Sequence, residues 1–172
     1  MTALDFAMLQ YIQQHIANPL LDYVMIAITH LGDYGIMWIA LCVILLAMPK
    51  TRRSGVMLAV AMVAGLVICN IVLKNAIARP RPFMVDSFPI LINPPMGYSF
   101  PSGHSCNSFV AATVIGMNYK RYRTVAFVMA LLIAFSRVYL YVHYPSDVIA
   151  GAAIGAGIGY ITVRLFGKYK RI

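Results

Sequence analysis

The sequence holds a small set of residues whose types and order suit the transfer of a phosphoryl group. In chain order these residues are Lys74, Arg81, Ser102, Gly103, His104, Arg137, His143 and Asp147. Arginine can bind a phosphate through two parallel hydrogen bonds, and imidazole can act as a nucleophile or a general acid near neutral pH. The set therefore predicts a phosphoryl-transfer site made of cations and two histidines.

The two histidines are expected to have different roles because their neighbours differ. His143 precedes Pro145, where one predicted helix ends, and Asp147 opens the next helix. The Asp147 carboxylate can reach the His143 ring, fix its tautomer and stabilise the imidazolium. We therefore expect His143 to attack phosphorus and form a phosphohistidine. His104 is expected to protonate the departing oxygen and then to deprotonate the attacking water.

The remaining residues are expected to hold the phosphate. Ser102 precedes a helix whose first backbone amides are unpaired, a position that binds anions, and Gly103 allows close approach. Lys74, Arg81 and Arg137 supply the positive charge. The sequence has no carboxylate cluster and no Cys/His spacing typical of a metal site, so we expect neither a metal nor a cofactor.

Three sequence blocks carry these residues: K-x6-RP from Lys74, PSGH from Pro101, and SR-x5-H-x3-D from Ser136. In this order they resemble the signature of the type 2 phosphatidic acid phosphatase (PAP2) superfamily, and the resemblance covers residues 74–147. It implies a helical bacterial membrane lipid phosphatase with the residue roles given above. Residues 1–70 add no family-specific pattern.

Composition and charge place these blocks in a membrane. Of 172 residues, 61% are hydrophobic and 11% charged, whereas soluble domains have about 25% charged residues. Ten of the fourteen basic residues form three clusters: Lys50, Arg52 and Arg53; Lys120, Arg121 and Arg123; Arg164, Lys168, Lys170 and Arg171. The clusters alternate with apolar stretches, so we expect no nucleic-acid partner. The positive-inside rule places the clusters in the cytoplasm and the candidate site on the extracellular side of the cell membrane.

The apolar stretches predict an all-α, multi-pass transmembrane bundle that forms one domain over residues 1–172. A crossing helix needs roughly 20 residues, and the five expected spans are 34–48, 54–73, 105–119, 124–142 and 148–166, which gives a transmembrane core over 34–166. Residues 1–17 predict a helix lying in the interface, and 20–31 is too short to cross alone. A sixth span within residues 1–31 is the alternative. Residues 83–100 are expected to form an outer loop over the helix ends.

A few residues outside the signature also carry expectations. Gly151, Gly155 and Gly159 favour close helix packing inside one bundle over a dimer face, and the oligomeric state stays open. Arg79 is expected to contact lipid headgroups or solvent. The other two histidines, His15 and His30, and the cysteines, Cys42, Cys69 and Cys106, are expected to have structural roles.

An outward-facing site within the membrane predicts a lipid phosphate as substrate. We expect undecaprenyl pyrophosphate first, and phosphatidylglycerol phosphate or phosphatidate next. A lipid-to-lipid phosphotransferase would use the same phosphohistidine with a different acceptor. An anion transporter is a further alternative, but it predicts cations spread through the membrane depth, whereas here they gather on one side.

Overall fold

The computed structural model describes residues 3–168, and every regular element within this range is a helix. The elements are α1 (Ala3–His15), α2 (Pro19–Gly32), the 3-10 turn η1 (Asp33–Gly35), α3 (Ile36–Ala47), α4 (Arg52–Gly65), the π-helix η2 (Leu66–Leu73), α5 (Lys74–Ile77), α6 (Pro82–Asp86), α7 (Gly103–Asn118), the 3-10 turn η3 (Lys120–Tyr122), α8 (Arg123–Tyr139) and α9 (Pro145–Lys168). The all-α expectation is confirmed.

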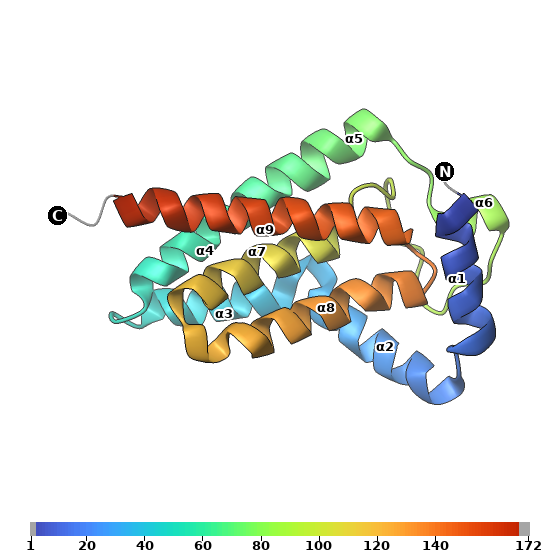
Figure 1. Ribbon diagram of the computed structural model, residues 1–172, viewed down its shortest axis with the longest axis horizontal. Helices are drawn as coiled ribbons and strands as arrows, with labels where there is room; N and C mark the ends of the chain where they lie inside the picture. Colours follow the sequence, from blue (N-terminus) through green and yellow to red (C-terminus); the bar gives the residue numbers. More distant parts are fainter. Residues whose placement is uncertain (1–2, 169–172) are drawn as a thin grey trace.

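Helix α7 is the central element of the bundle and packs against α4, α8 and α9 (Figure 1). Ten of its sixteen residues are buried. Its N-cap is Ser102, whose side chain accepts a hydrogen bond from the Ser105 backbone N–H. The Ser102 backbone N–H donates to the Asp147 carbonyl at the start of α9. The end of α7 that carries His104 is therefore fixed both by its own cap and by α9.

Helix α9 approaches α7 closely through three glycines. A Cβ atom at Gly151 would lie 2.5 Å from the Ser102 carbonyl oxygen, and one at Gly155 would clash with the Cys106 carbonyl oxygen. At Gly159 a Cβ would lie 2.9 Å from the nearest atoms of α7. The expectation that this stripe packs inside the bundle is confirmed, and the stripe sets the spacing between the two helices that carry the histidine motifs.

Two departures from α-helical geometry lie next to residues of the signature. Tyr34 and Gly35 have left-handed φ angles of 51° and 73° and turn the chain between α2 and α3. This turn leaves the side chain of Asp33 facing α7. The π-helix η2 directly precedes Lys74, and π-helical turns occur frequently at functional sites.

The outward faces of the bundle are apolar, as a lipid environment requires. Ile39, Val43 and Val63, on α3 and α4, are between 47% and 60% exposed, and contiguous apolar surface of this kind is rare on soluble monomers. Four stretches are long and apolar enough to cross a membrane: Pro19–Ala47, Arg52–Asp86, Lys120–Tyr139 and Pro145–Gly167. The chain therefore has the helices of a multi-pass membrane protein.

Two of the expected segments do not coincide with any one of these four stretches. Residues 20–31 were expected to be too short to cross alone, and they join α3 in the 29-residue stretch Pro19–Ala47. Helix α7, which matches the expected span 105–119, has sixteen residues and rises about 24 Å, less than the ~30 Å of a hydrocarbon core. The count of five spans stays a prediction.

The two ends of the bundle differ as the charge pattern predicts (Figure 1). The described residues of the three basic clusters lie at one end, in or beside the α3–α4 connection, the α7–α8 connection and the C-terminal end of α9. Helices α1 and α6 and the α8–α9 connection lie at the other end, where α1 runs across the bundle rather than along it. Lys170 and Arg171 of the third cluster, and Met1 and Thr2 of the expected interfacial helix, lie outside the described residues. The expected loop 83–100 begins within the short helix α6.

Gly155→Ala should destabilise the protein, whereas Gly157→Ala should not. The added methyl group at residue 155 meets the Cys106 carbonyl, and overpacking of this kind costs about 1–3 kcal/mol. Nothing lies within 4 Å of a Cβ at Gly157, where alanine gains about 0.5–1 kcal/mol of helix propensity. Thermal unfolding in detergent compares the variants, and equal changes in Tm would contradict the packing described here.

Candidate active site

A cavity of about 880 Å³ lies where the signature blocks meet. Five of the predicted site residues line it: Lys74, Arg81, Gly103, His104 and His143. Its remaining walls come from α2 and the α2–α3 turn, from η2 and α7, and from residues 90–96 of the outer loop. The structure therefore brings both histidines and two of the three cations around a single space.

His143 is joined to Asp147 through a serine that the sequence analysis did not single out. Ser99 Oγ donates to Asp147 Oδ2 at 2.5 Å and lies 3.4 Å from His143 Nδ1. The direct distance from His143 Nδ1 to Asp147 Oδ2 is 3.6 Å. All three residues are at most 2% exposed. The carboxylate therefore reaches the ring, as the spacing predicts, and Ser99 bridges the two.

The other ring nitrogen of His143 faces Arg81. Arg81 Nη1 lies 3.2 Å from His143 Nε2. Because a guanidinium has only donors, Nε2 must accept this hydrogen bond, and the proton of the neutral ring is on Nδ1. Nε2 therefore presents its lone pair on the Arg81 side of the ring.

Backbone carbonyls hold the Arg81 guanidinium in place. Its Nε donates to the Gly97 carbonyl at 2.9 Å, its Nη2 to Met96 at 3.1 Å and its Nη1 to Val142 at 2.9 Å. Within residues 3–168, no carboxylate lies within ion-pairing distance of this buried guanidinium. The positive charge is thus positioned by the protein but not neutralised by a paired anion.

The environment of His143 keeps its ring unprotonated. Burial lowers the pKa of His143 well below its usual value of 6.5, and the neighbouring cations Arg81, Arg137 and Lys74 lower it further. The imidazole is therefore neutral at physiological pH, which is the form that can act as a nucleophile.

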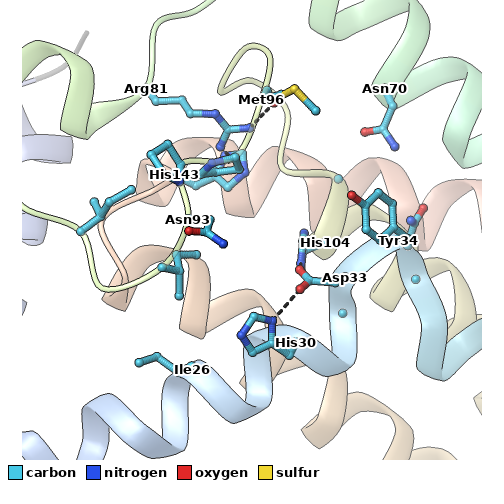
Figure 2. A pocket seen from close by; sticks show the side chains of 18 of the residues that line it. Ile26, His30, Asp33, Tyr34, Asn70, Arg81, Asn93, Met96, His104 and His143 are labelled. Atoms are coloured by element: carbon cyan, nitrogen blue, oxygen red, sulfur yellow. Dashed lines mark hydrogen bonds and ion pairs between the residues drawn. The ribbon is translucent and has the colours of Figure 1, made fainter.

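His104 lies across the cavity from His143, in the first turn of α7. Its Nε2 is 3.0 Å from Asp33 Oδ1, and the other oxygen of that carboxylate is 2.7 Å from His30 Nδ1. In Figure 2, Arg81 and His143 lie together on one side, and His104, Asp33 and His30 lie on the other. His30, which was expected to have a structural role, lines the cavity with Asp33.

The other three predicted site residues lie behind the cavity wall. Ser102, Arg137 and Asp147 are at most 2% exposed and do not line the cavity. Arg137 Nη1 donates to Thr29 Oγ1 at 2.5 Å, and its buried Nε has no hydrogen-bond partner among residues 3–168. A buried unpaired donor is costly, so Arg137 retains a hydrogen bond for an acceptor. The phosphate-binding roles of Ser102 and Arg137 stay predictions.

Two asparagines add polar groups to the cavity wall. Asn70 and Asn107 line the cavity, and in the described part of the chain the buried Oδ1 atom of each has no hydrogen-bond partner. A Cβ atom at Gly103 would lie 2.5 Å from Asn70 Oδ1. Glycine at residue 103 therefore allows η2 to approach the N-terminus of α7.

The Arg79 side chain is only 14% exposed and is bound by protein groups, so the expectation that it contacts lipid headgroups or solvent is wrong. Its guanidinium donates to Asp147 Oδ1 at 2.6 Å, to Asp5 Oδ2 at 2.8 Å and to Ser146 Oγ at 2.8 Å. The Tyr144 ring centroid lies 3.8 Å from the guanidinium carbon. The physical reason is that a fully buried Asp147 requires a counter-charge. Asp5 extends this contact to α1.

Two of the residues that the sequence analysis missed share one detectable feature. The chain has five acidic residues, and three of them, Asp5, Asp33 and Asp147, lie at the site. A carboxylate in an apolar chain is costly and marks a functional position by default, so this rarity could have pointed to Asp5 and Asp33. Ser99 gives no comparable signal beyond its position two residues before the PSGH block.

The described residues hold no group of three or more His, Cys, Asp or Glu side chains placed to bind a metal ion. The nitrogens of His30 and His104 point at the two oxygens of Asp33 rather than at a shared centre. The cysteines are buried, as expected, and Cys69 Sγ lies 2.7 Å from Cys106 Sγ.

Comparison with known proteins bears out the resemblance. Residues 54–171 match the model of the PAP2 superfamily. The chain belongs to this superfamily. It is 35% identical to an undecaprenyl-diphosphatase of Sulfolobus acidocaldarius over 148 residues, 83% of this chain and 71% of that protein.

Two solved structures have the same fold. The structure of LpxE from Aquifex aeolicus superposes with a TM-score of 0.83 at 31% identity and covers 95% of this chain and 96% of that chain. A phosphatidylglycerolphosphate phosphatase of Bacillus subtilis superposes with a TM-score of 0.79 at 30% identity, over 99% of this chain and 90% of that one. Both proteins match the chain well beyond the signature blocks.

The lowered pKa of His143 predicts that its ring stays reactive in mildly acidic solution. Diethyl pyrocarbonate modifies only neutral imidazole, so modification of His143 in the substrate-free protein should continue undiminished as the pH falls through 6.5. Mass spectrometry of the peptide that contains residue 143 measures this, and the absence of substrate removes the titration of a substrate phosphate. Loss of modification at or above pH 6.5 would contradict the burial of this ring among cations.

Proposed function

We propose that this protein hydrolyses a phosphate or pyrophosphate group of a membrane lipid through a phosphohistidine at His143. The observation that carries the proposal is the 3.2 Å contact between Arg81 Nη1 and the unprotonated His143 Nε2. It places a nucleophilic lone pair beside a guanidinium that has no paired carboxylate. A phosphoryl group bound by Arg81 would lie within reach of that lone pair.

Positive charge around the cavity supports the binding of a phosphate. Lys74 and Arg81 line the cavity, and Arg137 lies behind it with an unpaired Nε donor. The first backbone amides of α7, at Gly103 and His104, offer further donors at a helix N-terminus. Phosphoryl transfer depends mainly on positioning and on stabilising negative charge, and fixed donors provide both.

The placement of the two histidines supports in-line displacement. His143 and His104 lie on opposite sides of the cavity (Figure 2), and the attacking and leaving groups of a phosphoryl transfer must lie roughly in line. The Nε2–P bond of His143 forms as the bond between phosphorus and the lipid oxygen breaks, and that oxygen takes a proton from His104. Water then attacks phosphorus and gives a proton to His104, the Nε2–P bond breaks, and phosphate leaves.

We propose undecaprenyl pyrophosphate as the first substrate to test, with phosphatidylglycerol phosphate or phosphatidate next. The cavity volume of about 880 Å³ exceeds the needs of one phosphate, and Ile90, Leu91 and Ile92 of the outer loop line it. An apolar wall beside a cationic centre suits an amphiphile. Undecaprenyl-diphosphatase is the name of the Sulfolobus acidocaldarius relative, which favours the isoprenoid substrate.

The proposal includes a membrane topology. One domain over residues 1–172 would cross the cell membrane five times, counting α7, with α1 in the interface and the cavity on the extracellular side. The position of the basic connections at the opposite end of the bundle supports this orientation (Figure 1).

Phosphate release by the purified protein, measured across the three lipids, tests the proposal. We expect the wild type to release phosphate and both His143→Ala and His104→Ala to lose at least about a hundredfold of that activity. A rapid acid-free quench with phosphorus-labelled substrate should place the label on residue 143. His15→Ala is the matched control, because the exposed His15 ring contacts its own helix, and it should keep full activity.

Two outcomes would contradict the proposal. Turnover by His143→Ala at the wild-type rate would exclude that ring as the nucleophile. Release of phosphate only when a second lipid is present, with the phosphoryl group recovered on that lipid, would instead identify a lipid-to-lipid phosphotransferase.

A further inference from the structure

A carboxylate stands between two imidazoles on the side of the cavity opposite His143. Asp33 Oδ1 is 3.0 Å from His104 Nε2, and Asp33 Oδ2 is 2.7 Å from His30 Nδ1. The Asp33 side chain is 38% exposed and lines the cavity with both rings. Figure 2 shows the three side chains in a row, with His30 and Asp33 contributed by the α2–η1 segment. None of these contacts involves His143 or Asp147.

We propose that Asp33 is a positioning residue for His104 and forms with it a second carboxylate–imidazole pair, dedicated to the leaving group of the reaction. The inference rests on the proposed function, because it assigns a partner to the general acid of that mechanism. The site then contains two such pairs: Asp147 with His143 for attack on phosphorus, and Asp33 with His104 for proton transfer.

The hydrogen-bond pattern determines what Asp33 does to the His104 ring. A carboxylate accepts hydrogen bonds, so His104 Nε2 carries a proton that it donates to Asp33. Nδ1 is then the ring nitrogen left for a substrate oxygen. The packing agrees, because the Cδ2–Nε2 edge of the ring faces α2, where a Cβ at Gly32 would lie 2.6 Å from Cδ2. Asp33 therefore fixes the ring orientation and the tautomer, as carboxylates do for other catalytic histidines.

The charge on Asp33 also favours the protonation of His104. His104 must hold a second proton before it can protonate the leaving oxygen, but the cavity already contains Lys74 and Arg81. A neighbouring carboxylate stabilises the imidazolium against those cations. The proton passes from His104 Nδ1 to the leaving oxygen as the P–O bond breaks, and His104 recovers a proton from the attacking water.

His30 completes this arrangement by holding the carboxylate. Its Nδ1 donates to Asp33 Oδ2, which leaves Oδ1 directed at His104. Because the His30 side chain is 60% exposed and does not contact His104, its removal should loosen Asp33 without removing the pair. We therefore expect a smaller effect at residue 30 than at residue 33.

The test compares two leaving groups in the same variants. A nitrophenolate can leave phosphorus without a proton, whereas the alkoxide of a short-chain phosphatidate needs one from a general acid. The measured quantity is kcat/KM, because it reports only the steps up to departure of the leaving group. Dioctanoyl phosphatidate and 4-nitrophenyl phosphate are assayed with the wild type, Asp33→Asn, His30→Ala and Ser99→Ala.

We expect Asp33→Asn to lower kcat/KM for the alkyl substrate about a hundredfold and for the aryl substrate less than about threefold. Ser99→Ala is the matched control on the nucleophile side, and it should lower both values by a similar factor. Activity retained on the aryl substrate shows that Asp33→Asn is folded. Asp33→Glu, which keeps the carboxylate, should recover part of the alkyl activity and provides the same comparison if the asparagine variant fails to fold.

Equal losses for the two substrates in a folded residue-33 variant would overturn the inference and leave the proposed function standing. A wild type that hydrolyses neither substrate nor the lipids above would overturn the proposed function itself. If His30→Ala lost more activity than the Asp33 variant, this would overturn the inference that Asp33 positions His104 and that His30 only holds Asp33.

Discussion

The buried carboxylate of Asp147 is the contact on which the geometry of the site depends. One oxygen accepts from Arg79, and the other accepts from Ser99 Oγ and from the Tyr144 backbone N–H. A buried charge is tolerated only when it is paired and hydrogen-bonded. These three partners therefore stabilise the carboxylate of Asp147 in the first turn of α9. Asp147 and Ser99, which these contacts hold in place, in turn position the His143 ring. Helix α1 also contacts the site, because Arg79 donates to both Asp5 and Asp147.

The charged groups around the cavity differ in whether they contact a group of opposite charge. Asp5 and Asp147 are matched by Arg79, and Asp33 accepts hydrogen bonds from two imidazoles. Arg81 and Arg137 are hydrogen-bonded to carbonyls and a hydroxyl instead of carboxylates. Donors held in this way need little reorganisation when negative charge arrives, which is the condition for electrostatic stabilisation of a transition state. In the proposed function, a phosphate dianion supplies the negative charge that Arg81 and Arg137 lack.

The sequence predicts both histidines and the contact between His143 and Asp147, but it does not predict the contact between His104 and Asp33. His143 and Asp147 are four residues apart, so their contact follows from a helix boundary. His104 and Asp33 are 71 residues apart, and their contact depends on the left-handed turn at Tyr34 and on the docking of α2 against α8. The helices themselves were predictable from apolar length, whereas the pairing of Arg79 with Asp5 requires knowledge of how α1 crosses the bundle.

The residues proposed to act on phosphorus and the partners of His104 lie in different parts of the chain. The residues proposed to attack and hold phosphorus lie within 54–171, the segment that matches the PAP2 model. The contact partners of His104 and Arg137, namely Asp33 and Thr29, lie before residue 54, on η1 and α2. Phosphorus chemistry is the same for every lipid phosphate, but the leaving oxygen differs between a phosphate and an alkyl alcohol. In the proposed mechanism, the groups that orient His104 thus come from a different segment than His143, but the two segments are in contact, because Met25 of α2 packs in one cluster with Val142 and Tyr144 on either side of His143.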